Sequence, residues 1–197
     1  MPMLLNEDAA LKALLSNITV SDSGNDSRPV GVFYGQPDPQ IRQQSYPYIT
    51  IDLIGVSEAT ERTHSGIATL PYTPEGYSSE HEYTTPYPIA IDLMYQITTW
   101  SRQPRHDRQL IAELSRYNRL PQRFGMIAIP EDGTVRRLDM LGFQKRDMTE
   151  DGKRLFVNVY TVQMSAEFLR ADLEQIYKVQ TTNISFMSQD TIFTITQ

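Results

Sequence analysis

The chain has 197 residues, a net charge of −6 and no cysteine. Its length predicts one domain that buries a core of its own, and the lack of cysteine excludes disulfides, thiolate metal ligands and a cysteine nucleophile. The negative charge argues against a protein that wraps nucleic acid, because such proteins neutralise phosphates with Lys and Arg.

The first segment of the chain predicts a helix. Four apolar residues at helical spacing share one face: Leu4, Leu11, Leu15 and Ile18. Glu7 and Asp8 suit the positive end of the helix dipole. This segment lacks a basic start, carries Glu7 and Asp8 instead and is unlike a signal peptide, and no run in the chain approaches the roughly 18 apolar residues of a membrane span. We therefore expect no membrane segment.

A phrase that begins with Tyr-Pro occurs twice, as YPYITIDL in residues 46–53 and as YPIAIDL in residues 87–93. Apolar residues alternate with polar ones in both copies, which is the period of a half-buried strand. Proline lacks a backbone donor, so it stands at the strand entry. We expect two strands that enter one sheet in similar fashion. We interpret the repetition as shared strand vocabulary, with an internal duplication as the alternative. A shorter strand is predicted from Val30 to Tyr34.

A second helix is predicted after Pro104, which suits a first helical position. Its apolar stripe runs through Leu110, Ile111, Leu114 and Tyr117. Three arginines crowd its N-terminal end, where the helix dipole disfavours them: Arg102, Arg105 and Arg108. This patch is either a solvated surface or a place for a carboxylate from a neighbouring chain.

Hairpins follow Pro121. Strands are predicted at residues 124–129, 135–143 and 155–162, and turns at Glu131-Asp132-Gly133 and Asp151-Gly152. The order is therefore helix, three strands, helix, three strands. It predicts an α+β fold with a single twisted, mostly antiparallel sheet and helices packed on one face.

Two segments lie outside this core domain of residues 1–170. The segment of residues 57–86 is too long for an ordinary connection between strands. It predicts an inserted, projecting loop or hairpin arm. Residues 171–197 predict an extended C-terminal arm that docks on its own body or adds a strand to a neighbour. Candidate contacts in these arms are Tyr72, Tyr77, Tyr83, Ile184, Phe186 and Phe193.

No catalytic motif is present in the sequence. It contains no phosphate-binding loop, dinucleotide fingerprint, nucleophile elbow or metalloprotease helix. Asp52 and Asp92 take equivalent places in the repeated phrase and could do acid–base work only if they faced each other in a cleft. We expect no catalytic residue, no metal and no cofactor. The alternative is a soluble enzyme that uses the arm histidines, His64 and His81, with a carboxylate.

Residues 88–114, PIAIDLMYQITTWSRQPRHDRQLIAEL, resemble the strand-to-helix passage of bacteriophage tail terminator proteins, which belong to the phage neck. The carrying phrase is YQITTWSR at residues 95–102, and the order of elements is similar over residues 1–168. The resemblance implies a structural virion protein, not an enzyme, that is assembled in the host cytoplasm. It also implies a ring, usually a hexamer, that caps the tail tube and meets the head-side connector or head-closure protein. In a contractile tail the ring also meets the sheath.

In such a ring, Trp100 and the three arginines are expected at a subunit or partner interface. DNA would pass through without sequence-specific binding, because acidic lumen residues repel its backbone. The lumen-facing candidates are Glu131, Asp132, Asp147, Glu150 and Asp151. Both arms are longer than a minimal terminator needs, which leaves open a head-closure or adaptor ring of the same neck. A third alternative is an adaptor for one non-viral partner, which would be a stable monomer.

Overall fold

The computed structural model describes residues 4–22, 24, 26–37, 46–70, 75–76, 81–131, 133–150, 152–168 and 174–177. The chain divides into two compact units, of which the first comprises Met1–Arg62 and Ala90–Phe168 and the second Thr63–Ile89 and Leu169–Gln197. Helices and a mostly antiparallel sheet make the fold α+β, which confirms the predicted class.

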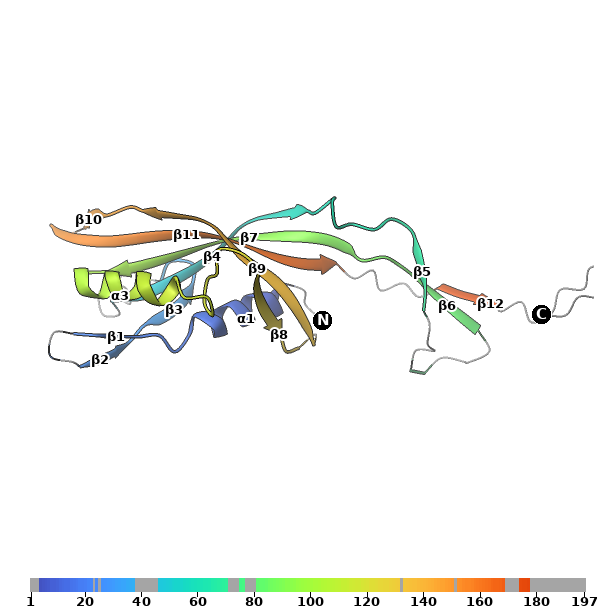
Figure 1. Cartoon of the computed structure of the whole chain (residues 1–197), viewed down its shortest axis with the longest axis horizontal. Helices are drawn as coiled ribbons and strands as arrows, with labels where there is room; N and C mark the ends of the chain where they lie inside the picture. The colour runs from blue at the N-terminus through green and yellow to red at the C-terminus, as the bar shows by residue number, and fades with distance from the viewer. Residues whose placement is uncertain are drawn as a thin grey trace, which may run out of the picture. The chain divides into compact units, whose positions relative to one another are not determined.

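The main sheet of the first unit has the strand order β3-β4-β7-β11-β9-β8, and β10 pairs with β11 (Figure 1). Its strands are β3 (Gly31–Tyr34), β4 (Tyr48–Glu58), β7 (Ile89–Ser101), β8 (Gly125–Ile129), β9 (Thr134–Lys145), β10 (Met148–Glu150) and β11 (Lys153–Phe168). The β3–β4 pair is parallel, whereas the β4–β7, β9–β11, β8–β9 and β10–β11 pairs are antiparallel. Although β11 comes last in this sheet, it lies between β7 and β9 and joins the first strands to the β8–β9 hairpin.

The two helices that the structure describes pack on the same face of this sheet. They are α1 (Leu5–Leu15) and α3 (Pro104–Leu114). In α1, Asp8 accepts a hydrogen bond of 2.6 Å from the Tyr95 hydroxyl of β7. In α3, Asp107 accepts one of 2.6 Å from Asn158, which also donates to Thr99 of β7. Since Tyr95 and Thr99 are four residues apart on one strand, they point to the same side of the sheet, and the predicted one-sided packing is confirmed.

The predicted faces of the first repeated strand need correction. Thr50 is fully buried and accepts a hydrogen bond from the Trp100 indole, whereas Leu53 is 41% exposed. The reason is an aromatic cluster around Tyr48 and Trp100, which covers the face that the sequence pattern assigned to solvent. Leu53 is on the other face, beyond the residues 48–51 that pair with β3, so among the strands described β4 has no neighbour on that side at Leu53.

The two copies of the repeated phrase form β4 and β7, which are neighbours in the sheet. They pair antiparallel, with Tyr48 opposite Trp100, and the register shifts between Leu53 and Gly55. They therefore enter the sheet from opposite ends, and not in the similar fashion expected from their wording.

The stripe predicted for the second helix is too long at its C-terminal end. Helix α3 ends at Leu114, and Tyr117 lies beyond it with 72% of its surface exposed. The amide of Leu120 donates to the carbonyl of Leu114, so the chain turns back after the helix. Within the ranges that the structure describes, no helix is long and apolar enough to span a membrane.

The remaining strands form two small sheets. β1 (Thr19–Ser21) and β2 (Ser27–Pro29) make a hairpin in the first unit. The second unit holds a sheet of order β12-β6-β5, built from β5 (Ile67–Thr69), β6 (His81–Pro86) and β12 (Glu174–Tyr177). Strands from the predicted arm and from the predicted C-terminal extension thus belong to one sheet. Residues 57–62, assigned to the arm by composition, belong to the first unit.

Candidate assembly surfaces

The arginine cluster at the start of α3 does not behave as one patch. Arg102 forms an ion pair of 2.7 Å with Glu150 and donates a second bond of 3.1 Å to the Glu150 carbonyl. Its guanidinium also lies 4.9 Å from the centre of the Tyr46 ring. The charge of Arg102 is therefore matched within the chain, so it differs from the free interface charge that the sequence predicts.

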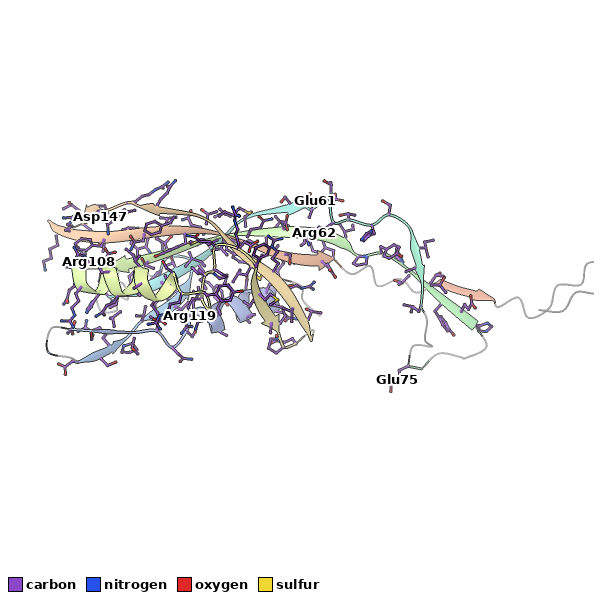
Figure 2. The ribbon with its side chains drawn as sticks, in the orientation of Figure 1. Glu61, Arg62, Glu75, Arg108, Arg119 and Asp147 are labelled. Carbon is purple, nitrogen blue, oxygen red and sulfur yellow. The ribbon has the colours of Figure 1, made fainter. Side chains whose placement is uncertain are left out.

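Arg105 and Arg108 remain exposed on the same helix. Arg105 makes one long hydrogen bond of 3.4 Å to Ser21, and Arg108 has no ion pair in the described part of the chain. Figure 2 labels Arg108 on α3. Together with Pro104, Gln109 and Ala112 the two arginines line a surface depression of about 430 Å³. Arg105 and Arg108 can therefore bind a carboxylate from another chain, as predicted, whereas Arg102 already has a partner.

A buried polar network holds α3 on the sheet. Asp107, only 3% exposed, accepts hydrogen bonds from Asn158 of β11 and Lys145 of β9. Burial, with the nearby negative charge of Asp107, raises the pKa of the Tyr160 hydroxyl well above its ordinary value. His106, also buried, lies 2.6 Å from the Asp22 carboxylate beside the β1–β2 hairpin. These polar groups bind one another and so serve packing.

Two of the predicted lumen acids are paired. Asp147 lies 2.8 Å from Arg154 and 3.6 Å from Lys145. Desolvation alone would raise the pKa of Asp147, but the hydrogen bond from Arg154 and the charge of Lys145 bring it below its ordinary value. Glu150 is the partner of Arg102. Glu131 is exposed and has no ion pair among the residues described, whereas Asp132 and Asp151 lie outside them.

Two of the predicted interface residues, Trp100 and Tyr83, are buried in their own chain. Trp100 is 9% exposed and stacks on Tyr48 in the core, and Tyr83 is 2% exposed in the second unit. Both side chains are thus covered by their own chain, which differs from the interface role expected of them. The other predicted contacts lie outside the described residues: Tyr72, Tyr77, Ile184, Phe186 and Phe193.

An apolar surface that the sequence did not single out lies on the β8–β9 hairpin. Met126 stands opposite Arg137 on the outward face and is 75% exposed, while the next pair on this face brings Val135, 62% exposed, opposite Ala128. The inward residue Ile127 is buried. We call Arg123, Phe124, Met126, Val135 and Arg137 the hairpin face.

Phe124 is held outward by its backbone. Its φ of 58° lies in the left-handed region, which is unusual for a bulky residue, and its side chain is 71% exposed. At Gly125 a Cβ atom would lie 2.1 Å from the carbonyl oxygen of Leu138, so only glycine fits. Arg137 lies 5.7 Å from the centre of the Phe124 ring. The geometry thus presents an aromatic ring to the outside, next to a cation.

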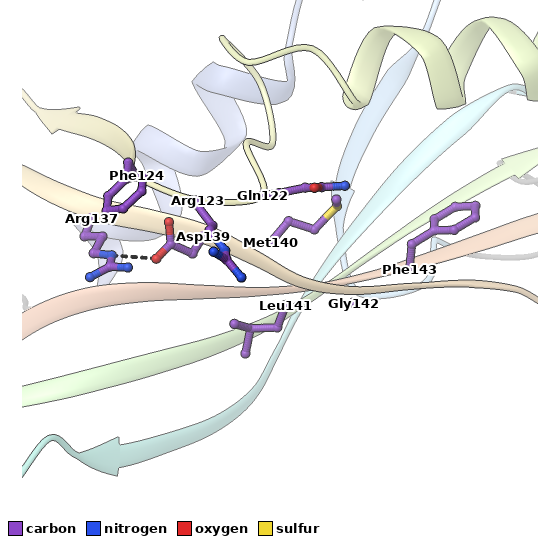
Figure 3. A pocket seen from close by; sticks show the side chains of 9 residues that line it. All are labelled: Gln122, Arg123, Phe124, Arg137, Asp139, Met140, Leu141, Gly142 and Phe143. Atoms are coloured by element: carbon purple, nitrogen blue, oxygen red, sulfur yellow. Dashed lines mark hydrogen bonds and ion pairs between the residues drawn. The ribbon is translucent and has the colours of Figure 1, made fainter.

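A depression of about 660 Å³ lies beside the hairpin face, lined by residues 122–124 and by residues 137 and 139–143 (Figure 3). Arg137 forms an ion pair of 2.5 Å with Asp139. Arg123 makes no ion pair with any described residue, so one cation on this rim is unmatched. Such a mixture of apolar and cationic groups is suited to a protein partner that carries apolar side chains and carboxylates.

The residues of the enzyme alternative do not form a site within the first unit. Burial raises the pKa of Asp52, which stands opposite Gln96. Asp92 lies on the same face of β7 as Gln96, four residues away, which is about 13 Å along a strand. It is paired with Arg62, so it is not facing Asp52 as an acid–base partner.

The histidines of the second unit show no ligand cluster. The ring of His64 lies 5.8 Å from that of Tyr87, and His81 is part of β6. Over the described ranges, no group of three or more histidine or carboxylate side chains is placed to hold a metal ion.

Comparison with models of known protein families gives no match, and comparison with curated proteins gives no significant match either.

Proposed function

We propose that this protein is a structural protein of a phage neck, a tail terminator that forms a ring, caps the tail tube and joins it to the head connector. The proposal rests first on the resemblance of residues 88–114. In the structure this segment is one strand, β7, followed at once by α3 with Pro104 in its first turn. This agrees with a strand-to-helix passage.

The observation that carries an assembly role is the hairpin face. Phe124, Met126 and Val135 each expose more than 60% of their surface on one hairpin at the edge of the sheet. Apolar side chains that gather in this way are typical of surfaces that bind other proteins. An edge strand without a neighbour also favours association.

The test is native mass spectrometry of the full chain over a range of concentrations, followed by negative-stain electron microscopy of any oligomer. We expect a closed ring, with six times the monomer mass as the leading expectation, and a central opening. A chain that stays monomeric at every concentration, also after chemical cross-linking, would overturn the ring.

The position in the neck is tested separately, by incubating the ring with purified tail tubes and imaging the tube ends. Binding at one end of the tube supports a terminator. A ring that ignores tube ends and binds an isolated connector would be the head-closure or adaptor ring.

A further inference from the structure

We propose that the hairpin face binds a second copy of this chain at an acidic row on β4, so that successive copies associate head to tail. This inference rests on the proposed ring function and names the two surfaces that would form its subunit contact. The row consists of Leu53, Val56 and Glu58, continued in the chain by Glu61.

The residues of the acidic row share one face of β4. The register places Leu53, Val56 and Glu58 opposite Tyr95, Leu93 and Ile91, which alternate along β7 and so point to one side. Leu53 is 41% and Val56 47% exposed. Glu58 and Glu61 are both exposed, and neither has an ion pair in the described ranges; Figure 2 labels Glu61 at the end of this segment.

The two surfaces are complementary in charge. The hairpin face brings Arg123, with no ion pair among the described residues, and the acidic row brings two such glutamates. Each surface places its charges next to exposed apolar side chains. If the hairpin face packs against the acidic row, apolar area of both surfaces is removed from water, and the arginine of one surface pairs with the glutamates of the other.

Their places in the sheet favour a head-to-tail contact. β8 is the last strand at one end of the sheet order, and β4 beyond Ile51 has no neighbour on the β3 side among the strands described. Two different surfaces of one molecule that bind each other make a heterologous interface, which forms a ring when the rotation closes. The register shift at Leu53 and Gly55 disfavours a continuous ladder across the contact, so side chains would carry it.

The experiment is a charge exchange across the contact. Arg123→Glu and Glu58→Arg each place like charges together, so each variant alone should need at least about tenfold more protein for half-assembly in native mass spectrometry or sedimentation. An equimolar mixture of the two variants should assemble at the wild-type concentration. In alternating order, each glutamate at position 123 meets an arginine at position 58, and each native Arg123 meets a native Glu58.

Two matched controls carry the same charge changes elsewhere. Arg108→Glu alters an exposed arginine on α3, and Glu75→Arg alters an exposed glutamate in the second unit. We expect neither to change the half-assembly concentration. Circular dichroism and urea unfolding of every variant should match the wild type, because all four positions are exposed.

The outcomes separate the two proposals. If the wild type forms a ring and the mixture does not restore assembly, the contact proposed here is overturned while the ring stands. If Arg108→Glu abolishes the ring and Arg123→Glu does not, the contact is on α3 and not on the hairpin. If the wild type forms no oligomer, both the ring and this contact are lost.

Discussion

The start of α3 and the hairpin face both carry arginines beside aromatic rings, yet they have opposite relations to the rest of the chain. At α3, Arg102 binds Glu150 and lies over Tyr46, and buried Asp107 is satisfied by Lys145 and Asn158. At the hairpin, Arg123 has no ion pair with a described residue and Phe124 points outward. The number of charges in a segment therefore says less about binding than the number of partners those charges already have.

The largest effect is expected from breaking the α3 network with Asp107→Ala. The change removes Asp107 as an acceptor of the buried Asn158 amide, which keeps its hydrogen bond to Thr99, and it removes the carboxylate that Lys145 binds. Because Lys145 is partly exposed and can be hydrated, we expect a loss of about 3 kcal/mol in the free energy of unfolding, at the low end for a buried pair. Urea unfolding measures it, with Glu131→Ala as an exposed control expected within about 0.5 kcal/mol. A loss below 1 kcal/mol would mean that the network does not hold the helix.

The next effect is expected on the hairpin, from Gly125→Ala. The new methyl would overlap the carbonyl oxygen of Leu138 and the ring of Pro121, so the strand must shift. We expect a loss of about 2 kcal/mol in unfolding free energy. Gly142→Ala is the matched control, since a Cβ there meets nothing within 4 Å. Equal stability of the two variants would contradict the close approach at Gly125.

A smaller effect of opposite sign is expected from Phe124→Gly. Glycine relieves the left-handed backbone at this position, although it also loosens the unfolded chain, so we expect the isolated chain to gain up to about 1 kcal/mol. Assembly should weaken at the same time, because an exposed ring of the hairpin face is lost. Comparing urea unfolding with the half-assembly concentration separates the two effects. A variant that loses stability would show that the ring of Phe124 packs on its own chain.

The smallest effect concerns Asp147, whose pKa is lowered in the folded chain. A lowered pKa means that the carboxylate stabilises the fold above its ordinary value of 3.8 and that this contribution disappears as the pH falls through the folded value. The stability of the wild type should therefore fall toward that of Asp147→Asn below about pH 4. Urea midpoints of both proteins from pH 7 to pH 3 measure this. A difference that stays constant over that range would contradict it.

Much of the fold could be predicted from local patterns. The alternation in residues 89–97 marks a strand with one buried face, and Pro104 marks the first turn of α3, as the structure shows. The turn at Gly133, with a positive φ of 62°, agrees with the expected hairpin. These features depend on neighbours in the sequence, so a single chain contains enough information to predict them.

The sequence predictions that the structure corrects concern contacts between residues far apart in the chain. Thr50 is buried because Trp100, fifty residues later, closes over it. Asp107 finds its partners 38 and 51 residues away, and no spacing rule connects them. The hairpin face was not predicted because the segment Phe124 to Ile129 is apolar on both faces. Alternation of apolar and polar residues does not indicate which face of such a strand is buried. A signal was present in Phe124-Gly125, where glycine beside an aromatic residue indicates a close backbone approach.

The place of β11 in the sheet has a consequence for the order in which the chain is made. β7 ends at Ser101, and its neighbour β11 begins only at Lys153. At typical translation rates the roughly 50 intervening residues take about 3 to 10 s to synthesise. During that time the early strands and the β8–β9 hairpin are two separate nascent pieces, each with an edge awaiting the same strand. Growing chains on one messenger are close neighbours, and each keeps these two edges open during that time. The sheet is complete only when the ribosome has added β11, the longest strand.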